Sequence, residues 1–373
     1  MRRIILIQCI FLFTLFSCAQ EKENNEQTQP DPKNYTTEII VPDLQIPWGM
    51  TWLPDGSMLI TEKSGELIHF KEGNKIEINN VPEVYQRGQG GLLDIEIHPK
   101  YSENGWIYLS YSSQEGGGEG GNTALIRAKL QNNQLVDIQK LYKGAENTKK
   151  GQHFGSRIEF DNDGYLYFSI GDRGNRDVNP QDVTRDGGKI YRFNDDGSIP
   201  DDNPFVNEPE AKKAIFSYGH RNPQGMALNP VDGKIWVHEH GPRGGDEINA
   251  IDKAANYGWP LITYGINYSG TPITDITEKE GMEQPIHYWV PSIAPSGMVF
   301  VTSDIYPNWK NDLLVGSLKF NYLELVELDG TKVTGRTKLL DDIGRVRNVR
   351  QGPDGYVYVA VEGKGILKII PGA

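Results

Sequence analysis

The chain has 373 residues, 42 glycines and 22 prolines, with 37% hydrophobic residues and a formal net charge of -12. This length fits one large β-domain or two smaller domains. The acidic balance argues against duplex nucleic acid as a partner, because such a partner requires a basic face, although an acidic surface can still hold a local basic pocket.

Residues 1–18, MRRIILIQCIFLFTLFSC, join a charged start to an apolar core that is too short to stay as a membrane anchor. This pattern predicts an export signal. Its ending, Leu-Phe-Ser-Cys, resembles the bacterial lipoprotein cleavage box, which implies removal of residues 1–17 and a lipidated Cys18. An ordinary secretory signal is the alternative. Removal also takes Cys9, so the mature chain would hold no disulfide.

The next segment ends at residue 34 and is polar, with the sequence AQEKENNEQTQPDPKN after Cys18. It lacks aromatic and branched residues, which is typical of a disordered tether. We therefore predict three parts: a signal at 1–17, a tether at 18–34 and a folded domain at 35–373. The protein would be periplasmic or anchored to the outer membrane, in contact with lipid only through Cys18.

Six copies of one hairpin pattern fill the folded part. Each copy has an apolar strand, a turn and a second strand, and most of the turns end in glycine. The copies start near residues 48, 91, 155, 225, 297 and 346. More strand-like sequence follows the pairs, such as KIYRF after the third and NYLELVEL after the fifth, which makes about four strands per unit.

The spacing between copies exceeds the roughly 40–50 residues usual for one propeller blade, and the excess lies in polar loops. These repeats predict an all-β fold, a six-bladed β-propeller. TTEIIV at 36–41 would add the outer strand of the last blade and close the ring. A β-sandwich or two stacked β-domains is the alternative, but neither requires six copies of one hairpin.

The ends of these hairpins gather polar residues on one face. Because each turn occupies one end of its unit, the residues before the first strand and after the second strand share the other end. Those before first strands are Gln89, His153, Arg221, Asn222, Arg345 and Arg347, and those after second strands are Asp172, Gly241, Pro242 and Lys319. Four cations in an acidic protein imply an anionic ligand in a partly dehydrated cleft.

His153 and Asp172 belong to the same unit. A carboxylate beside an imidazole fixes its tautomer and raises its basicity, as a general base requires. Taken singly, His153 fits a satisfied turn residue and each arginine fits a rim charge. Lys319 ends a buried strand, where an unpaired lysine is costly.

The stretch HGPRGGDE offers oxygen ligands. Asp246 and Glu247 follow a Gly-Gly pair, and the carbonyls of Gly241 and Pro242 lie upstream, so that a hard cation is one interpretation. A solvent-exposed acidic turn is the other. The nearby His238 and His240 lack the third ligand of a zinc site.

Six motifs, GQGGLL, GDRG, GHRNPQG, HEHGPRGGDE, NYGWP and GRVRNV, together resemble the soluble pyrroloquinoline-quinone (PQQ)-dependent glucose/sorbosone dehydrogenases, in particular the aldose sugar dehydrogenase branch. The similarity covers residues 36–371. That family has a six-bladed propeller. The resemblance implies that PQQ and Ca²⁺ serve as cofactors and that the C1 hydroxyl of an aldose is oxidised to a lactone by hydride transfer to the quinone.

The resemblance also implies roles for the gathered residues. His153 would be the general base, oriented by Asp172, and Arg221 would stabilise charge on the quinone oxygen. The cofactor contacts would be Lys319, Arg345 and Arg347 on its carboxylates, Gln89 and Asn222 as neutral groups, and the carbonyls of Gly241 and Pro242 on a shared calcium. Asp246, Glu247 and Tyr257 fall where some relatives bind further calcium near a dimer contact, which allows a homodimer.

Two other functions fit a propeller. A calcium-dependent lactonase would centre carboxylate and amide ligands on the channel axis, without four cations. A non-catalytic binding propeller would not need His153 and Asp172 in one unit. After the GDxG motif the glucose-specific branch has a glutamine, where this chain offers Asn175, Arg176 or Asp177. The sequence thus leaves open which sugar is oxidised and which acceptor takes the electrons.

Overall fold

The structure is a computed structural model that describes residues 34–372, all within one unit at residues 32–373. The predicted signal peptide, Cys18 and the tether lie outside the described residues. None of the helices in this part of the chain is long and apolar enough to cross a membrane. The two short helices are α1 (Tyr101–Asn104) and the 3-10 turn η1 (Pro307–Trp309).

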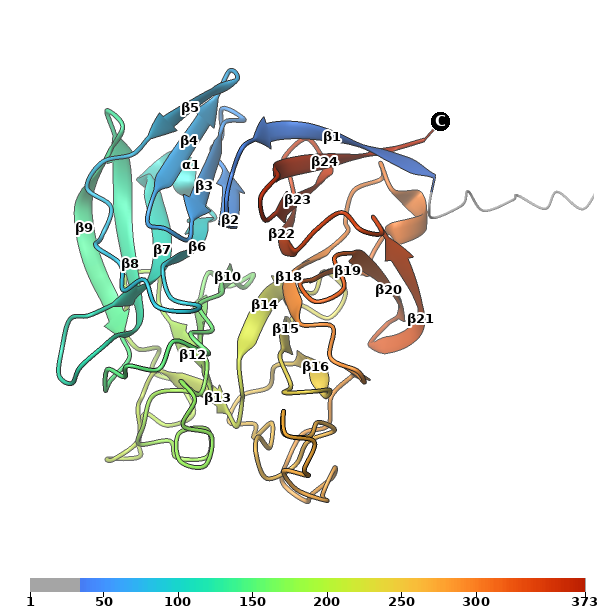
Figure 1. The fold of residues 1–373 in the computed structure, drawn as a ribbon. Helices are drawn as coiled ribbons and strands as arrows, with labels where there is room; N and C mark the ends of the chain where they lie inside the picture. The colour runs from blue at the N-terminus through green and yellow to red at the C-terminus, as the bar shows by residue number, and fades with distance from the viewer. Residues whose placement is uncertain (1–33, 373) are drawn as a thin grey trace, which may run out of the picture. The chain divides into compact units, whose positions relative to one another are not determined.

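Six four-stranded antiparallel sheets are arranged in a ring, so the predicted six-bladed propeller is confirmed (Figure 1). Blade 1 contains β2 (Pro47–Trp52), β3 (Met58–Glu62), β4 (Leu67–Lys71) and β5 (Asn74–Glu77). Blade 2 contains β6 (Leu92–Ile97), β7 (Trp106–Ser113), β8 (Asn122–Gln131) and β9 (Gln134–Lys143). Blade 3 contains β10 (Ile158–Phe160), β11 (Leu166–Ile170), β12 (Lys189–Phe193) and β13 (Ile215–Tyr218).

The second half of the ring repeats the arrangement. Blade 4 contains β14 (Pro223–Leu228), β15 (Ile235–Glu239), β16 (Asp246–Ala250) and β17 (His287–Trp289). Blade 5 contains β18 (Pro295–Phe300), β19 (Leu313–Ser317), β20 (Leu323–Asp329) and β21 (Lys332–Leu339). Blade 6 contains β22 (Val346–Gln351), β23 (Val357–Val361), β24 (Gly365–Pro371) and β1 (Tyr35–Pro42).

The N-terminal strand β1 closes the ring, as predicted. It pairs antiparallel with β24, with Thr37 opposite Ile369 (Figure 1). A blade assembled from both ends of the described chain ties those ends together, so the circle has no free edge between its first and last blades.

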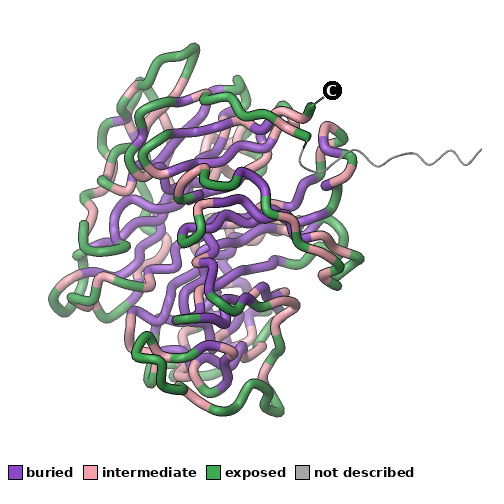
Figure 2. Tube along the Cα trace, turned by 45° about the vertical axis from the view of Figure 1, so that its right-hand side comes forward, coloured by how far each residue is buried: buried purple, intermediate pink, exposed green. Residues whose placement is uncertain are grey.

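Burial falls from the inner strands to the outer ones. Every residue is buried in β3, β11, β15, β19 and β23, the second strands of five blades. The outer strand β21 instead alternates exposed and half-buried residues (Figure 2). Apolar side chains of neighbouring blades share core clusters, such as the one that contains Leu59 of blade 1 and Leu109 of blade 2. The hydrophobic core therefore lies between the blades.

A buried arginine joins the blades at the centre. The Arg157 guanidinium donates to Asp94 Oδ1 at 3.1 Å and to the carbonyls of Gln224 at 2.7 Å and Arg347 at 3.0 Å. It also lies 4.0 Å from the ring centre of Trp48. These five residues lie at or near the start of the first strands of five different blades, and no sequence motif indicates this contact.

Candidate active site

The polar residues predicted at one face do meet there. In blade 4, Pro223 pairs with Glu239 and Leu228 with Ile235, which places Arg221 and Gly241 at the same end of the hairpin. A cavity of about 460 Å³ lies at this end. The predicted residues that line it are Gln89, His153, Asp172, Arg221 and Pro242. Loops that flank the first hairpins of blades 2, 3 and 4 therefore supply one site.

His153 and Asp172 form the expected pair. The Nδ1 of His153 lies 2.6 Å from Asp172 Oδ1, and the His153 side chain is 14% exposed while that of Asp172 is 1% exposed. Because an ionised carboxylate only accepts hydrogen bonds, Nδ1 carries the proton and Nε2 is left with its lone pair. No described residue hydrogen-bonds to this Nε2, so the imidazole can accept a proton from a molecule in the cavity.

The backbone around His153 is constrained. Its φ is 57°, in the left-handed region that non-glycine residues rarely adopt, and Gln89 Oε1 accepts a 2.7 Å hydrogen bond from its N–H. A Cβ on Gly171 would lie 2.5 Å from the His153 carbonyl oxygen and 2.8 Å from Asn222 Oδ1. The glycine of the GDRG motif therefore lets this loop pack closely against the end of β11.

Trp259, from a loop of blade 4, contacts the His153–Asp172 pair. Its Nε1–H donates to Asp172 Oδ2 at 2.9 Å, so both carboxylate oxygens are held. Burial acts to raise the pKa of Asp172, but its hydrogen bond with His153 holds that pKa below 3.8. Trp259 belongs to the NYGWP motif, and neither strand periodicity nor charge gave it a role beforehand.

Burial, followed by the nearby Arg221 guanidinium, lowers the pKa of His153 below its usual 6.5. The imidazole is therefore neutral at neutral pH. A base with a lowered pKa is active above that pKa and loses activity as the pH falls through it. For any reaction in which His153 takes a proton, we expect kcat/KM to fall on the acid side with a midpoint below 6.5. A pH–rate profile measures this midpoint, and a value above 6.5 would contradict the assignment.

A second lobe adjoins the cavity, with Gln89, Pro242 and Tyr268 lining both. Its volume is about 700 Å³. The cationic residues that line it are Arg243, Lys319, Arg345 and Arg347, and the described lining includes no Asp or Glu. This lobe therefore suits an anion better than any neutral ligand.

The cations of the lobe differ in how they are held. Glu362 accepts hydrogen bonds from Arg345 Nε at 2.7 Å and Arg347 Nε at 3.1 Å, which fixes both guanidinium groups. Within residues 34–372 no carboxylate pairs with Lys319, which is exposed beside the Phe320 ring. The sequence did not predict this role for Glu362. It directly follows β23, and its sequence context looks like that of an acidic residue in a solvent-exposed turn.

Asn222 and Gly241 are two further predicted site residues, and Gly241 lines the second lobe. Asn222 Oδ1 accepts a hydrogen bond from the Gly155 N–H at 3.2 Å, while its buried Nδ2 has no partner among the described residues. Arg221 donates to the carbonyls of His240 at 2.8 Å and Gly241 at 3.2 Å. An unpaired buried donor is costly, so a ligand that accepts from Asn222 would stabilise this arrangement.

Asp246, Glu247 and Tyr257, which were predicted to bind a further metal ion, have different surroundings from one another. Asp246 accepts from the N–H of Gly241 at 2.8 Å and Ile293 at 2.7 Å. Ser292 Oγ and the Ala294 N–H donate to it as well. Its oxygens thus hold the loop that carries Gly241. Residues 34–372 contain no group of three or more His, Cys, Asp or Glu side chains arranged to hold a metal ion.

Glu247 and Tyr257 lie on the other side of β16. Burial, followed by repulsion from Glu239, raises the pKa of Glu247 to about 8. The Tyr257 hydroxyl donates to the Ala250 carbonyl at 2.5 Å, and its ring stacks on His220 at 4.6 Å. The Asn249 Nδ2 donates to Glu247 at 3.3 Å, and the buried Oδ1 of Asn249 has no hydrogen-bond donor among the described residues.

The sequence profile of the Glucose / Sorbosone dehydrogenase family matches residues 44–368. The chain belongs to this family. Membership makes it an oxidoreductase, as predicted, and confirms the resemblance drawn from the six motifs.

Members of the glucose/sorbosone dehydrogenase family with known structures share the whole propeller. The chain is 43% identical to aldose sugar dehydrogenase YliI of Escherichia coli (strain K12), over 91% of this chain and 94% of that protein. The apo-form structure of the soluble aldose sugar dehydrogenase from Escherichia coli superposes with a TM-score of 0.86, at 42% identity, covering 90% and 99% of the two chains.

The structure of a PQQ-bound aldose sugar dehydrogenase from Streptomyces coelicolor is also similar to this chain. It superposes with a TM-score of 0.75 at 26% identity, covering 91% of this chain and 99% of that one.

Proposed function

We propose that the protein is a PQQ- and calcium-dependent dehydrogenase that oxidises the C1 hydroxyl of aldose sugars to lactones. The main support for this proposal is the arrangement of side chains in the site. A neutral imidazole, held by a buried carboxylate, faces a cavity that opens into a lobe with four cations and no lining acid. The family's PQQ-bound member supports the choice of cofactor.

When bound, PQQ supplies the hydride acceptor that the protein's side chains lack. His153 Nε2 takes the proton of the C1 hydroxyl. Asp172 keeps the imidazole in the required tautomer and stabilises the imidazolium that forms. Arg221, on the same cavity wall, places a positive charge where oxygen charge develops.

The residues of the second lobe fit a molecule with three carboxylates. Lys319, Arg345 and Arg347 would hold it, with Gln89 and Asn222 as neutral contacts. The exposed ammonium of Lys319, which pairs with no carboxylate among the described residues, supports this fit. The lobe also disfavours the lactonase alternative, because its described lining contains no carboxylate ligand.

Two positions fit calcium. The carbonyls of Gly241 and Pro242 would hold the ion nearest the cofactor and expose it as a Lewis acid. The acceptor-rich surroundings of Glu247, with Glu239 and the unpartnered Asn249 Oδ1, support a second ion beside Glu247. Asp246 and Tyr257 would flank this ion while keeping their hydrogen bonds to the backbone of Gly241, Ile293 and Ala250. A cation there would offset the repulsion between the two glutamates.

The test is reconstitution of purified protein. We expect dye reduction with an aldose only when PQQ and Ca²⁺ are both added, and loss of activity when a chelator removes the calcium. Lys319→Ala should weaken PQQ binding by roughly 10- to 100-fold, the range for one hydrogen bond to a charged group. Lys310→Ala is the matched control, because its ammonium pairs with Asp304 on the surface. Absence of both PQQ binding and dye reduction would refute the proposal.

The export signal, the lipid on Cys18 and a periplasmic or outer-membrane location belong to residues outside the described part. They remain predictions from the sequence, as do a homodimer and the identity of the electron acceptor.

A further inference from the structure

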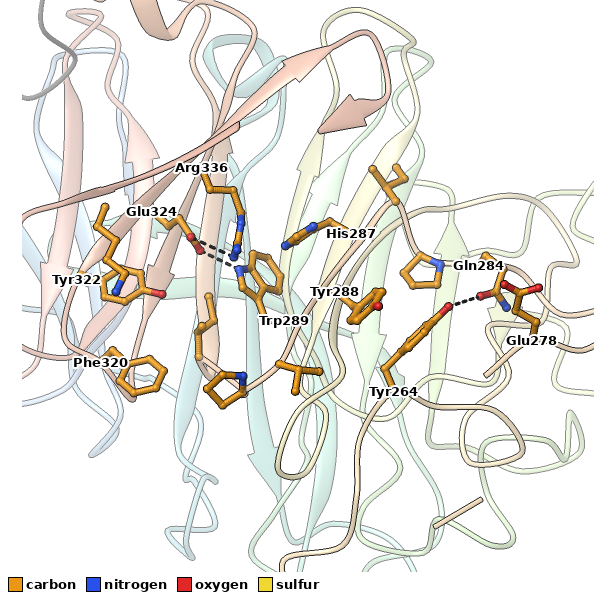
Figure 3. A pocket seen from close by; sticks show the side chains of 16 residues that line it. Tyr264, Glu278, Gln284, His287, Tyr288, Trp289, Phe320, Tyr322, Glu324 and Arg336 are labelled. Atoms are coloured by element: carbon orange, nitrogen blue, oxygen red, sulfur yellow. Dashed lines mark hydrogen bonds and ion pairs between the residues drawn. The ribbon is translucent and has the colours of Figure 1, made fainter. Parts of the chain in front are cut away.

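A larger hollow lies between the outer strands of blades 4 and 5 (Figure 3). Its volume is about 970 Å³. One side is formed by β17 and the loop that precedes it, and the other by Phe320, Tyr322 and the edge strand β21. None of the residues assigned to PQQ, calcium or proton transfer lines this groove.

Aromatic rings present flat faces on both sides of the groove. Tyr264 and Tyr288 stack with ring centres 3.8 Å apart and an interplanar angle of 7°. On the opposite side Phe320 lies nearly parallel to Tyr322, at 6.2 Å and 2° (Figure 3). Tyr288 is 42% exposed and Phe320 is 41% exposed, and both line the same groove, as exposed aromatic groups at ligand-binding grooves do.

Polar groups of both kinds lie between these rings. The buried Glu324 carboxylate accepts from Trp289 Nε1 at 2.8 Å and from Arg336 at 3.4 Å, which fixes the floor of the groove (Figure 3). Gln284 also lines the groove, where its Oε1 accepts a 3.0 Å hydrogen bond from Tyr264 while its Nε2 donates to the Thr277 carbonyl at 3.2 Å. Lys338 adds a cationic donor on β21.

His287 is the least satisfied of these groups. Its Nε2 is buried without a hydrogen-bond partner among the described residues. Burial, followed by the charge of Arg336, lowers the pKa of His287 to about 4, so the ring is neutral and can both donate and accept. A hydroxyl group, which also donates and accepts, matches such a partner.

We propose that this groove is a second, non-catalytic binding site for saccharides, in which pyranose rings lie on the Tyr264–Tyr288 pair and on Phe320. A pyranose has apolar C–H faces that pack on aromatic rings and a rim of hydroxyls that both donate and accept. The groove joins these two features, and at 970 Å³ it is about twice the size of the 460 Å³ catalytic cavity. It therefore fits a chain of sugar units.

The groove is also connected to the catalytic face. Pro291 lines both the groove and the cationic lobe, and Lys319 and Phe320 are consecutive residues that face the lobe and the groove respectively. A saccharide held in the groove would therefore lie against the wall of the active site. Only the choice of ligand class rests on the proposed function.

Binding is tested on PQQ-free protein, so that the result does not depend on the redox reaction. We expect the wild-type protein to be retarded in native gels that contain amylose, laminarin or hydroxyethyl cellulose, in at least one of the three. Tyr264→Ala/Tyr288→Ala should weaken that retardation by roughly tenfold in apparent affinity, because it removes the stacked pair. Val231→Ala is the matched control, since Val231 is 58% exposed in the turn at the other end of blade 4.

Each outcome decides the proposal. Retardation that the double variant loses and Val231→Ala keeps would support it. No retardation in any of the three gels, or equal retardation of the double variant at an unchanged melting temperature, would overturn it. So would a wild-type dimer that the double variant converts to monomer, because the groove would then be an interface between copies. PQQ binding and dye reduction with a monosaccharide, measured in parallel, separate this failure from failure of the proposed function.

Discussion

Replacing His153 with alanine is expected to lower turnover by ~10² to 10⁴-fold, the range over which a positioned general base contributes. The imidazole Nε2 faces the catalytic cavity, and its Nδ1 is held by Asp172 at 2.6 Å. Removing it leaves the hydroxyl proton without an acceptor. The cations of the second lobe are untouched, so PQQ binding should stay largely intact. Dye-coupled turnover and PQQ titration of the same preparations measure the two effects separately.

His69→Ala is the matched control for this variant. Burial lowers the pKa of His69 as it does that of His153, but His69 lies in blade 1 and hydrogen-bonds Ser57 at 2.8 Å, in the turn opposite the active site. Its removal should leave turnover unchanged. If His153→Ala retained full turnover at equal PQQ occupancy, the imidazole would have no part in proton transfer.

The fold and the meeting of the site residues were both predictable, for one reason. Alternating apolar residues around repeated turns specify antiparallel hairpins, and a hairpin brings the residues outside its two strands to one end. His153 before β10 and Asp172 after β11 therefore had to be neighbours, whatever the rest of the chain does. The same rule, applied to the other blades, predicted that Lys319, Arg345 and Arg347 lie together, and they line the cationic lobe.

The residues that escaped prediction lie in loops to which the sequence pattern gave no role: Trp259 contacts the neighbouring blade, and Glu362 pairs within its own hairpin. Trp259 comes from the long loop between β16 and β17, which has no strand periodicity to place it, yet it binds Asp172 of blade 3. Glu362, the partner of Arg345 and Arg347, looks like any acidic turn residue until β22 and β23 are paired. Asp246 was predicted as a metal ligand because its stretch is rich in carboxylate and carbonyl oxygens. The sequence does not reveal that its carboxylate oxygens already accept hydrogen bonds from backbone N–H groups.

The second large predicted effect is on stability, and it concerns the buried ion pair at the centre of the propeller. We expect Asp94→Asn to lower the free energy of unfolding by about 3–5 kcal/mol, the cost of removing one partner of a buried ion pair. Asp94 Oδ1 lies 3.1 Å from Arg157, both side chains are nearly inaccessible, and burial already lowers the pKa of that guanidinium to about 10.

An amide at position 94 keeps the shape and leaves the charge of Arg157 without its ion-pair partner, at the point where it contacts the backbones of blades 4 and 6. Asp55→Asn is the control, because its pair with Lys71 is about half exposed and such pairs contribute only ~0–1 kcal/mol. Urea unfolding followed by tryptophan fluorescence compares the two. A loss for Asp94→Asn no larger than that for Asp55→Asn would mean that the apolar contacts between blades, and not this ion pair, hold the ring together.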